Sequence, residues 1–180
     1  ARWVIPVRPA HQVLHHHSVV ISAGSIVAIL PTTEAHAQYS ASRLVSLGEH
    51  ALIPGLVNLH THAAMNLMRG LADDLPLMDW LQQHIWPAEN RHVSVQFVHD
   101  GTLLACAEML RGGITCFNDM YFFPGAAAEA ALKAGMRAAI GLITLDHPTA
   151  YACDADTYLH KGLDIRDQYS AETLLSFSLA

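Results

Sequence analysis

The sequence lacks both the long hydrophobic runs of a membrane protein and the lysines of a nucleic-acid-binding protein. No stretch approaches the roughly 18 consecutive apolar residues that a membrane-spanning helix needs, and none resembles a signal peptide. Lys133 and Lys161 are the only lysines, and 10 Lys and Arg against 16 Asp and Glu give a formal net charge of −6. We therefore expect neither a membrane nor a nucleic acid as a partner, because phosphate binding requires a basic stripe.

Cysteine is also scarce, with Cys106, Cys116 and Cys153 forming an odd number without any CxxC spacing. This pattern is more typical of reduced thiols in a cytoplasmic protein than of a disulfide framework. Histidine, in contrast, is abundant at 13 residues. Either a metal site or several solvent-facing side chains would explain that count, so the positions of the histidines must decide.

The chain changes character near residue 50. Short β-rich runs precede it, including an expected hairpin around residues 22–24. After it, strands and helices alternate, which predicts parallel strands with helical crossovers. A doubly wound sheet and a (β/α)₈ barrel both fit; a barrel needs roughly 250 residues, so only its first half would be present. The later expected elements are strands at 56–60, 114–118, 136–143 and 174–179 and helices at 77–86, 92–110, 126–134 and 156–166.

His60 and His62 carry the chemistry of this sequence. They end the apolar run at residues 56–59, which follows a Pro-Gly pair. Residues two apart on a strand point to the same face, so both imidazoles can converge on one ion while Thr61 points away. Imidazoles suit Zn²⁺, Fe²⁺ and similar ions, and active sites of α/β folds lie at the carboxyl ends of parallel strands. We therefore expect a metal site here.

Two histidines do not complete a catalytic metal site, which needs three or four protein ligands and an open position. The other histidines lie on expected helix faces, in the β-rich part or in a loop, and we expect none of them to be a ligand. We expect the missing ligands beyond Ala180. The histidines set aside are His11, His15, His16, His17, His36, His50, His84, His92, His99, His147 and His160.

Seven motifs resemble the amidohydrolase superfamily, and within it the 5′-methylthioadenosine/S-adenosylhomocysteine deaminases and the related triazine hydrolases. Together they cover essentially the whole chain. They lie at residues 53–63, 68–70, 79–81, 86–89, 112–115, 118–121 and 134–137.

The resemblance implies a metal-bearing (β/α)₈ barrel, with residues 51–180 as its first half. It also implies a small β-sandwich built from both chain ends, with residues 1–50 as its N-terminal part. His60 and His62 would bind one divalent metal ion, with zinc ahead of iron or manganese. In the related deaminases a Trp and a Glu contact the nucleoside, and these roles transfer to Trp80 and Glu89 in the same segment.

The implied activity is hydrolytic deamination of a small molecule, an adenosine-type nucleoside. Its catalytic acid/base and remaining ligands would lie beyond Ala180, so we expect the 180 residues alone to be inactive. The family's second substrate-binding Arg has no counterpart after Arg137, which favours 5′-methylthioadenosine over S-adenosylhomocysteine. Two alternatives stay open: hydrolysis of a triazine or other ring substituent, and a non-catalytic binding protein that has kept the barrel frame.

Several side chains have a second interpretation. Trp80 is also a candidate core residue, and Glu89 a carboxylate favoured by the positive end of a helix dipole. Asp119 ends an expected strand, where it could orient a ligand or cap the next helix, and we assign it neither role. A half barrel also leaves two strand edges open, which predicts aggregation or a homo-oligomer formed by strand pairing.

Overall fold

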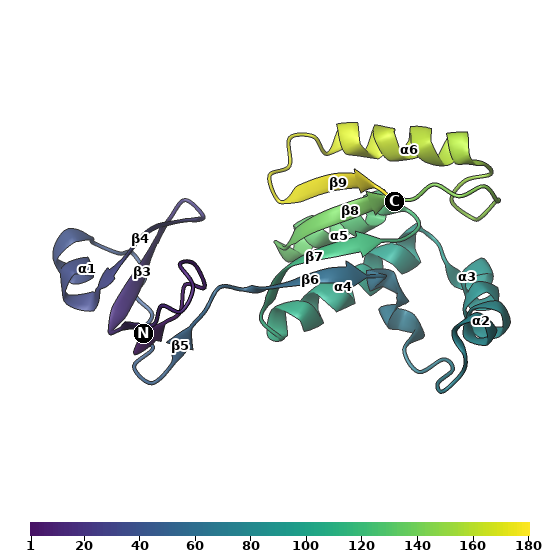
Figure 1. The fold of residues 1–180 in the computed structure, drawn as a ribbon. Coiled ribbons are helices and arrows are strands. Elements are labelled where there is room, and N and C mark those ends of the chain that lie inside the picture. Colours follow the sequence, from purple (N-terminus) through teal and green to yellow (C-terminus); the bar gives the residue numbers. More distant parts are fainter. The chain divides into compact units, whose positions relative to one another are not determined.

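The computed structural model describes all 180 residues, which form two units, Ala1–Pro54 and Gly55–Ala180 (Figure 1). The first unit contains a three-stranded sheet of order β2-β1-β5 and a separate two-stranded hairpin, β3-β4. Residues 51–54, which we expected in the barrel part, belong to this unit because β5 pairs with β1. Its elements are β1 (Trp3–Val4), β2 (Leu14–His15), β3 (His17–Ser22), β4 (Ser25–Pro31), α1 (Thr32–Gln38) and β5 (Ala51–Leu52).

The hairpin expected around residues 22–24 is confirmed. Its two turn residues, Ala23 and Gly24, have φ angles of 48° and 77°. Turns with positive φ at both central residues match the twist of the flanking strands, and glycine adopts this conformation without strain. Helix α1, which follows the hairpin, was not expected from the sequence.

The second unit alternates helices with four parallel strands. All pairings among the strands are parallel, and their order is β6-β7-β8-β9. The elements are β6 (Leu56–Thr61), the 3₁₀ helix η1 (Ala63–Met68), α2 (Leu77–Trp80), the π-helical turn η2 (Leu81–Ile85), α3 (Trp86–His92), α4 (Val95–Arg111), β7 (Ile114–Met120), α5 (Pro124–Ala134), β8 (Arg137–Leu142), α6 (Ala155–Gln168) and β9 (Leu175–Leu179).

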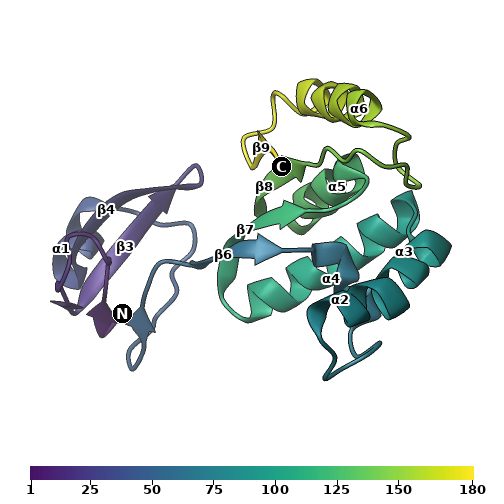
Figure 2. The same cartoon turned by 45° about the vertical axis from the view of Figure 1, so that its right-hand side comes forward.

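The strand order separates the two architectures that the sequence left open. A doubly wound sheet reverses its order at a switch point, whereas these four strands follow the chain without reversal. Because βαβ crossovers are right-handed, such an order places the connecting helices on one face, and α4 and α5 indeed lie together behind the sheet (Figures 1 and 2). This arrangement is that of a barrel wall, open at β6 and β9.

Two of the expected helix boundaries were wrong. The helix expected at residues 77–86 is interrupted by the π-helical turn η2 and continues as α3. The helix expected from residue 92 begins at Val95 instead, because the Ser94 hydroxyl accepts a hydrogen bond from the Phe97 N–H at 3.2 Å and caps the first turn of α4.

Small residues bring α4 close to the segment that follows β6. A Cβ atom on Gly101 of α4 would lie 2.5 Å from the carbonyl oxygen of Ala64 in η1, so only glycine fits at this crossing. Alanines of α5 pack against α4 in the same core, with Phe117 of β7 fully buried beneath them. The core therefore fixes η1, and with it the carboxyl end of β6.

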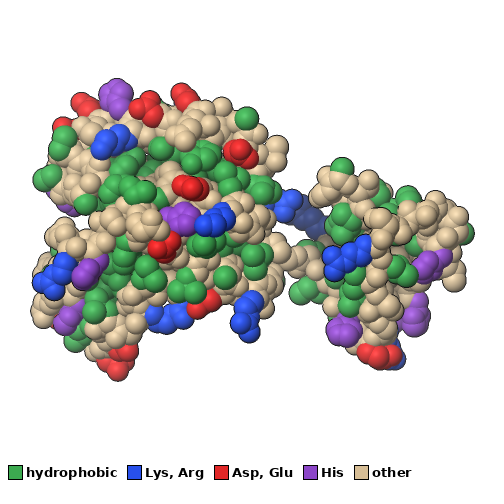
Figure 3. All heavy atoms as spheres, turned by 180° about the vertical axis from the view of Figure 1, so that it is seen from behind, with side chains coloured by type: hydrophobic (Ala, Val, Ile, Leu, Met, Phe, Trp, Pro, Cys, Tyr) green, Lys and Arg blue, Asp and Glu red, His purple; other side chains and the backbone are tan.

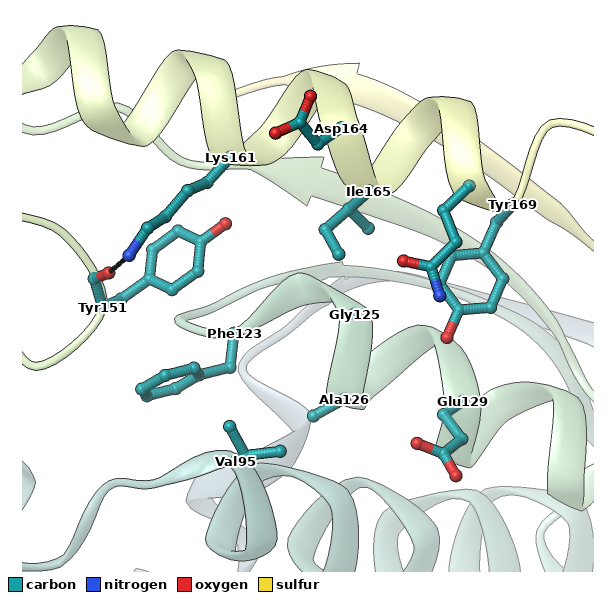
Figure 4. Close-up of a pocket in the computed structure, with 11 residues that line it drawn as sticks. Val95, Phe123, Gly125, Ala126, Glu129, Tyr151, Lys161, Asp164, Ile165 and Tyr169 are labelled. Carbon is teal, nitrogen blue, oxygen red and sulfur yellow. Dashed lines mark hydrogen bonds between the residues drawn. The ribbon is translucent and has the colours of Figure 1, made fainter.

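A hollow lies between α5, α6 and the start of α4 (Figure 4). Lys161 on α6 donates to the carbonyl oxygen of Tyr151 at 2.6 Å, and the buried Tyr151 hydroxyl has no hydrogen-bond partner. Glu129 and Asp164 place two carboxylates around the same hollow. None of the metal or substrate residues expected from the sequence lines it.

Hydrophobic side chains reach the surface of both units (Figure 3). In the second unit they include Val57 and Leu59 on the open strand β6, and in the first Ile21 and Ile26 of the hairpin. None of the helices combines the length and the apolar character needed to cross a bilayer.

Candidate metal and substrate site

His60 and His62 lie side by side at the carboxyl end of β6. The two ring centroids are 5.1 Å apart, with the ring planes close to perpendicular at 83°. Nδ1 of His62 lies 2.6 Å from the carbonyl oxygen of Met120, the last residue of β7. Because a carbonyl oxygen only accepts hydrogen bonds, Nδ1 carries the proton, and Nε2 keeps the lone pair that a metal ion requires.

This geometry fits a shared metal ion. The ring centroids are 5.1 Å apart, which is close enough for one ion to bind a nitrogen of each imidazole. The hydrogen bond from His62 to Met120 is also the kind of outer contact that fixes the tautomer and orientation of ligating histidines.

Asp119 holds the turn that carries His62. Its side chain is 1% exposed, and Oδ1 accepts hydrogen bonds from the Ala63 N–H at 2.7 Å and from the Thr61 hydroxyl at 2.8 Å. Burial raises the pKa of Asp119, while the hydrogen bonds from Ala63 and Thr61 and the nearby His62 oppose that rise. The two residues that flank His62 are thereby tied to β7.

The sequence left the role of Asp119 undecided. In the structure its carboxylate binds the residues on either side of His62 and does not cap helix α5. In the sequence, the signal for this role is that Asp119 follows the next expected strand after the one that ends at His60. The exact contact depends on the register of β7, in which Asp119 lies opposite Thr61.

Glu89 of α3 reaches the same end of the sheet. Its Oε1 accepts a hydrogen bond from the Tyr121 hydroxyl at 2.7 Å, and the Tyr121 ring centroid lies 6.4 Å from that of His62. Burial raises the pKa of Glu89, while the hydrogen bond from Tyr121 and the nearby His62 lower it. The structure thus places Glu89 close to the histidine pair, and Tyr121, which the sequence did not single out, connects them.

Trp80 and Arg137 do not join this cluster. Trp80 ends α2 half-buried and makes no hydrogen bond or ring contact with His60, His62 or Glu89. Arg137 opens β8 opposite Cys116, near the amino ends of the strands. Through Cys116, Arg137 is level with Val57 of β6, so it lies three residues, about 10 Å, from His60 toward the amino ends of the strands.

The histidine pair stands without further ligands in these residues. No group of three or more His, Cys, Asp or Glu side chains is arranged to hold a metal ion. Several of the other histidines bind elsewhere; His160, for example, contacts the carbonyl oxygen of Asp156 on α6, and His99 contacts Asp100 on α4.

Comparison with known proteins places this chain in a family. The sequence profile of the amidohydrolase family matches residues 51–175. The chain belongs to the amidohydrolase family. The expected superfamily and barrel-type fold class are thereby confirmed, although the four strands form an open part of such a sheet and not a closed barrel.

Amidohydrolases similar to this chain include deaminases. A 5-methylthioadenosine/S-adenosylhomocysteine deaminase of Saccharophagus degradans is 52% identical over 98% of this chain and 40% of its own length. The crystal structure of an adenosine deaminase from Xanthomonas campestris with bound zinc has 48% identity and a TM-score of 0.96, over 99% of this chain and 40% of that protein. The chain thus spans about 40% of the length of these relatives.

A more distant amidohydrolase shares the fold alone. The structure of an atrazine chlorohydrolase from Arthrobacter aurescens in complex with zinc has a TM-score of 0.78 at 19% identity, over 99% of this chain and 44% of that protein. At this identity the likeness supports the barrel-type architecture and says nothing of the substrate.

Proposed function

We propose that this chain is part of a metal-dependent deaminase that removes the amino group of an adenosine-type nucleoside by hydrolysis, with 5′-methylthioadenosine as its substrate. The observation that carries the proposal is the paired arrangement of His60 and His62, with Nε2 of His62 free, in a chain 48% identical to a zinc-bound adenosine deaminase. The 52% identity to a 5-methylthioadenosine/S-adenosylhomocysteine deaminase supports the choice of nucleoside.

In this proposal His60 and His62 hold one divalent ion, which we infer to be zinc. When bound, the ion supplies a hydroxide nucleophile at neutral pH. The carbonyl oxygen of Met120 and the carboxylate of Asp119 keep His62 in place, because each binds His62 itself or a residue next to it. The remaining ligands and the general acid/base are placed outside residues 1–180, so the chain by itself is proposed to be inactive.

Glu89 and Trp80 are proposed to contact the nucleoside. Glu89 Oε2 makes no hydrogen bond within the chain and can accept one from a ribose hydroxyl, at the same sheet end as the histidines. Trp80, half-buried at the end of α2, offers a flat apolar surface for stacking on the base or the thioether. No second Arg follows Arg137 in β8, and this favours a substrate without a charged amino-acid tail.

The metal proposal is tested in a protein that carries this chain at the full length of its relatives. His62→Ala is expected to lower zinc affinity at least 100-fold in a competition titration with a chelator. His160→Ala is the matched control, because His160 also contacts a backbone carbonyl through Nδ1 but sits on the exposed side of α6. Equal zinc affinity in the two variants would contradict the metal site.

The reaction is tested by ammonia release. The zinc-loaded parent protein is expected to release ammonia from 5′-methylthioadenosine and to leave a chlorinated triazine unchanged. Chloride release from the triazine with no ammonia from the nucleoside would favour ring-substituent hydrolysis instead. If neither ammonia nor chloride is released and the zinc content is sub-stoichiometric, the non-catalytic alternative is favoured.

A further inference from the structure

The proposed function leaves Tyr121 without a role, although its contacts are specific. Tyr121 follows β7 directly and is 7% exposed. Its hydroxyl donates to Glu89 Oε1 at 2.7 Å, and its ring packs edge-on against Phe122 at a centroid distance of 5.1 Å. The Tyr121 hydroxyl therefore donates in a fixed direction, because the ring is buried and the backbone of Tyr121 continues the inner strand β7.

This hydrogen bond is the one contact that orients the Glu89 carboxylate. Glu89 makes no other side-chain hydrogen bond in the structure and no ion pair with Lys or Arg. A glutamate side chain in a helix otherwise samples several rotamers, and ordering it on binding costs free energy. With Oε1 bound to Tyr121, fewer orientations are open to the second oxygen, Oε2, which has no hydrogen-bond partner within the chain.

We propose that Tyr121 is a positioning residue for sugar recognition. It fixes Glu89 so that Oε2 accepts a hydrogen bond from the 2′,3′-diol of a ribonucleoside, and so makes the site selective for ribosides over substrates that lack these hydroxyls. The inference rests on the proposed function, and it adds the residue that determines selectivity for the sugar. It predicts that Tyr121 acts on substrate binding through Glu89 and not on the hydrolytic step.

The alternative is that Tyr121 is only a packing residue. Its ring lies in the same core as Ala63 and Phe117, so its removal could loosen the sheet end as a whole. A packing role would affect every substrate equally and would lower the melting temperature. A positioning role would affect substrates according to their hydroxyl groups.

The experiment compares two substrates in a protein at the full length of its relatives. Tyr121→Phe removes the hydroxyl and keeps the ring. We expect it to raise the KM for 5′-methylthioadenosine about tenfold, the scale of a lost hydrogen bond to a charged group, with kcat within about twofold of the parent value. The KM for the 2′,3′-dideoxy analogue is expected to match that of the parent.

Two further variants sharpen the comparison. Tyr169→Phe is the matched control, because Tyr169 also packs against the core and its hydroxyl contacts neither Glu89 nor the histidines. Glu89→Gln is expected to reduce discrimination between the two substrates, and adding Tyr121→Phe to it is expected to cause little further loss, because the two residues act as one unit.

Several outcomes would overturn the inference. Equal losses on both substrates would show a packing role, and an unchanged KM for the riboside would show that Tyr121 does not position Glu89. If Tyr121→Phe does not fold, 4-fluorophenylalanine at position 121 fills the volume of the hydroxyl without donating, and the same change in KM is expected. If the zinc-loaded parent releases no ammonia from either nucleoside, the proposed function fails first and this inference falls with it.

Discussion

Replacing Gly101 by alanine tests how the core positions the metal site. The added Cβ would lie 2.5 Å from the carbonyl oxygen of Ala64 and 2.9 Å from its Cα. Carbon–oxygen contacts in proteins are ordinarily about 3.3–3.6 Å long, so α4 and η1 must separate by about 1 Å. Both Ala64 atoms belong to the backbone, so no side-chain rotation can relieve the clash.

The expected cost follows from two opposing effects. Overpacking of a close helix crossing costs about 1–3 kcal/mol. Alanine is favoured over glycine in a helix interior by about 1 kcal/mol, which offsets part of that loss. We therefore expect Gly101→Ala to destabilise the protein by up to about 2 kcal/mol. Because His62 directly precedes η1, we also expect zinc affinity to fall about tenfold.

Urea denaturation and zinc titration of the full-length protein check both effects. Gly112→Ala is the matched control, because Gly112 has a φ of −81° and the nearest atom to an added Cβ is the Met109 carbonyl oxygen at 3.4 Å. It should leave the urea midpoint and the zinc affinity close to those of the parent. Equal behaviour of the two variants would refute the claim that the α4–η1 crossing positions His62.

Further predictions concern three residues of the second unit, Cys106, Ser94 and Asp119. Burial raises the pKa of Cys106 to about 12, so iodoacetamide at pH 8 should alkylate the exposed Cys153 and spare Cys106 until the protein is unfolded. Because the thiol pKa is higher in the folded state, stability should fall as the pH rises from about 9 toward 12, and Cys106→Ala should weaken that dependence in alkaline urea titrations. Ser94→Ala should destabilise the protein by about 1 kcal/mol through loss of the α4 cap, measured by urea denaturation. Asp119→Ala should weaken zinc binding about 10–100-fold, while Asp119→Asn, which keeps an oxygen for the Ala63 N–H, should largely preserve it; equal affinities would show that this contact does not position His62.

The sequence was sufficient for the features that depend on local pattern. The parallel strands, the hairpin and the histidine pair each follow from periodicity, turn residues or spacing within a few positions. Helix boundaries were less accurate, since the cap at Ser94 and the π-helical turn Leu81–Ile85 depend on hydrogen bonds that the apolar pattern does not reveal. Helix α1 is too short for its periodicity to stand out.

The supporting contacts of the site could not be predicted, because they depend on register. Asp119 reaches the turn around His62 only because it lies opposite Thr61 when β7 pairs with β6, and that pairing contains an irregularity between Asn58 and Thr61. A single sequence does not fix such a shift. The contact of Tyr121 with Glu89 further requires α3 to fold back over the sheet end, which is a tertiary contact between residues 32 positions apart.

The composite β-sandwich stays a proposal that the first unit makes testable. Residues lining an apolar depression there include Ile21, Ile26, Leu44 and Val45, and all four side chains are exposed. Exposed apolar patches of this kind mark surfaces that another segment covers. At the relatives' full length, these side chains should be protected from solvent, and hydrogen exchange of β3 and β4 should be slower than in the isolated chain; equal exchange would contradict the composite sandwich.

Three consecutive residues at the carboxyl end of β7 connect the two halves of the candidate site. Asp119 binds the turn around His62, the carbonyl oxygen of Met120 accepts a hydrogen bond from the His62 ring, and Tyr121 donates a hydrogen bond to Glu89. Because Asp119 and Met120 also pair with β8, a change in the register of β7 would move all three contacts together. Metal binding and nucleoside recognition therefore share one support. Tyr121→Phe, which removes only the contact with Glu89, should alter KM without altering zinc affinity. Gly141→Val, whose Cβ would lie 3.1 Å from the carbonyl oxygen of Asp119, should displace β7 and weaken both.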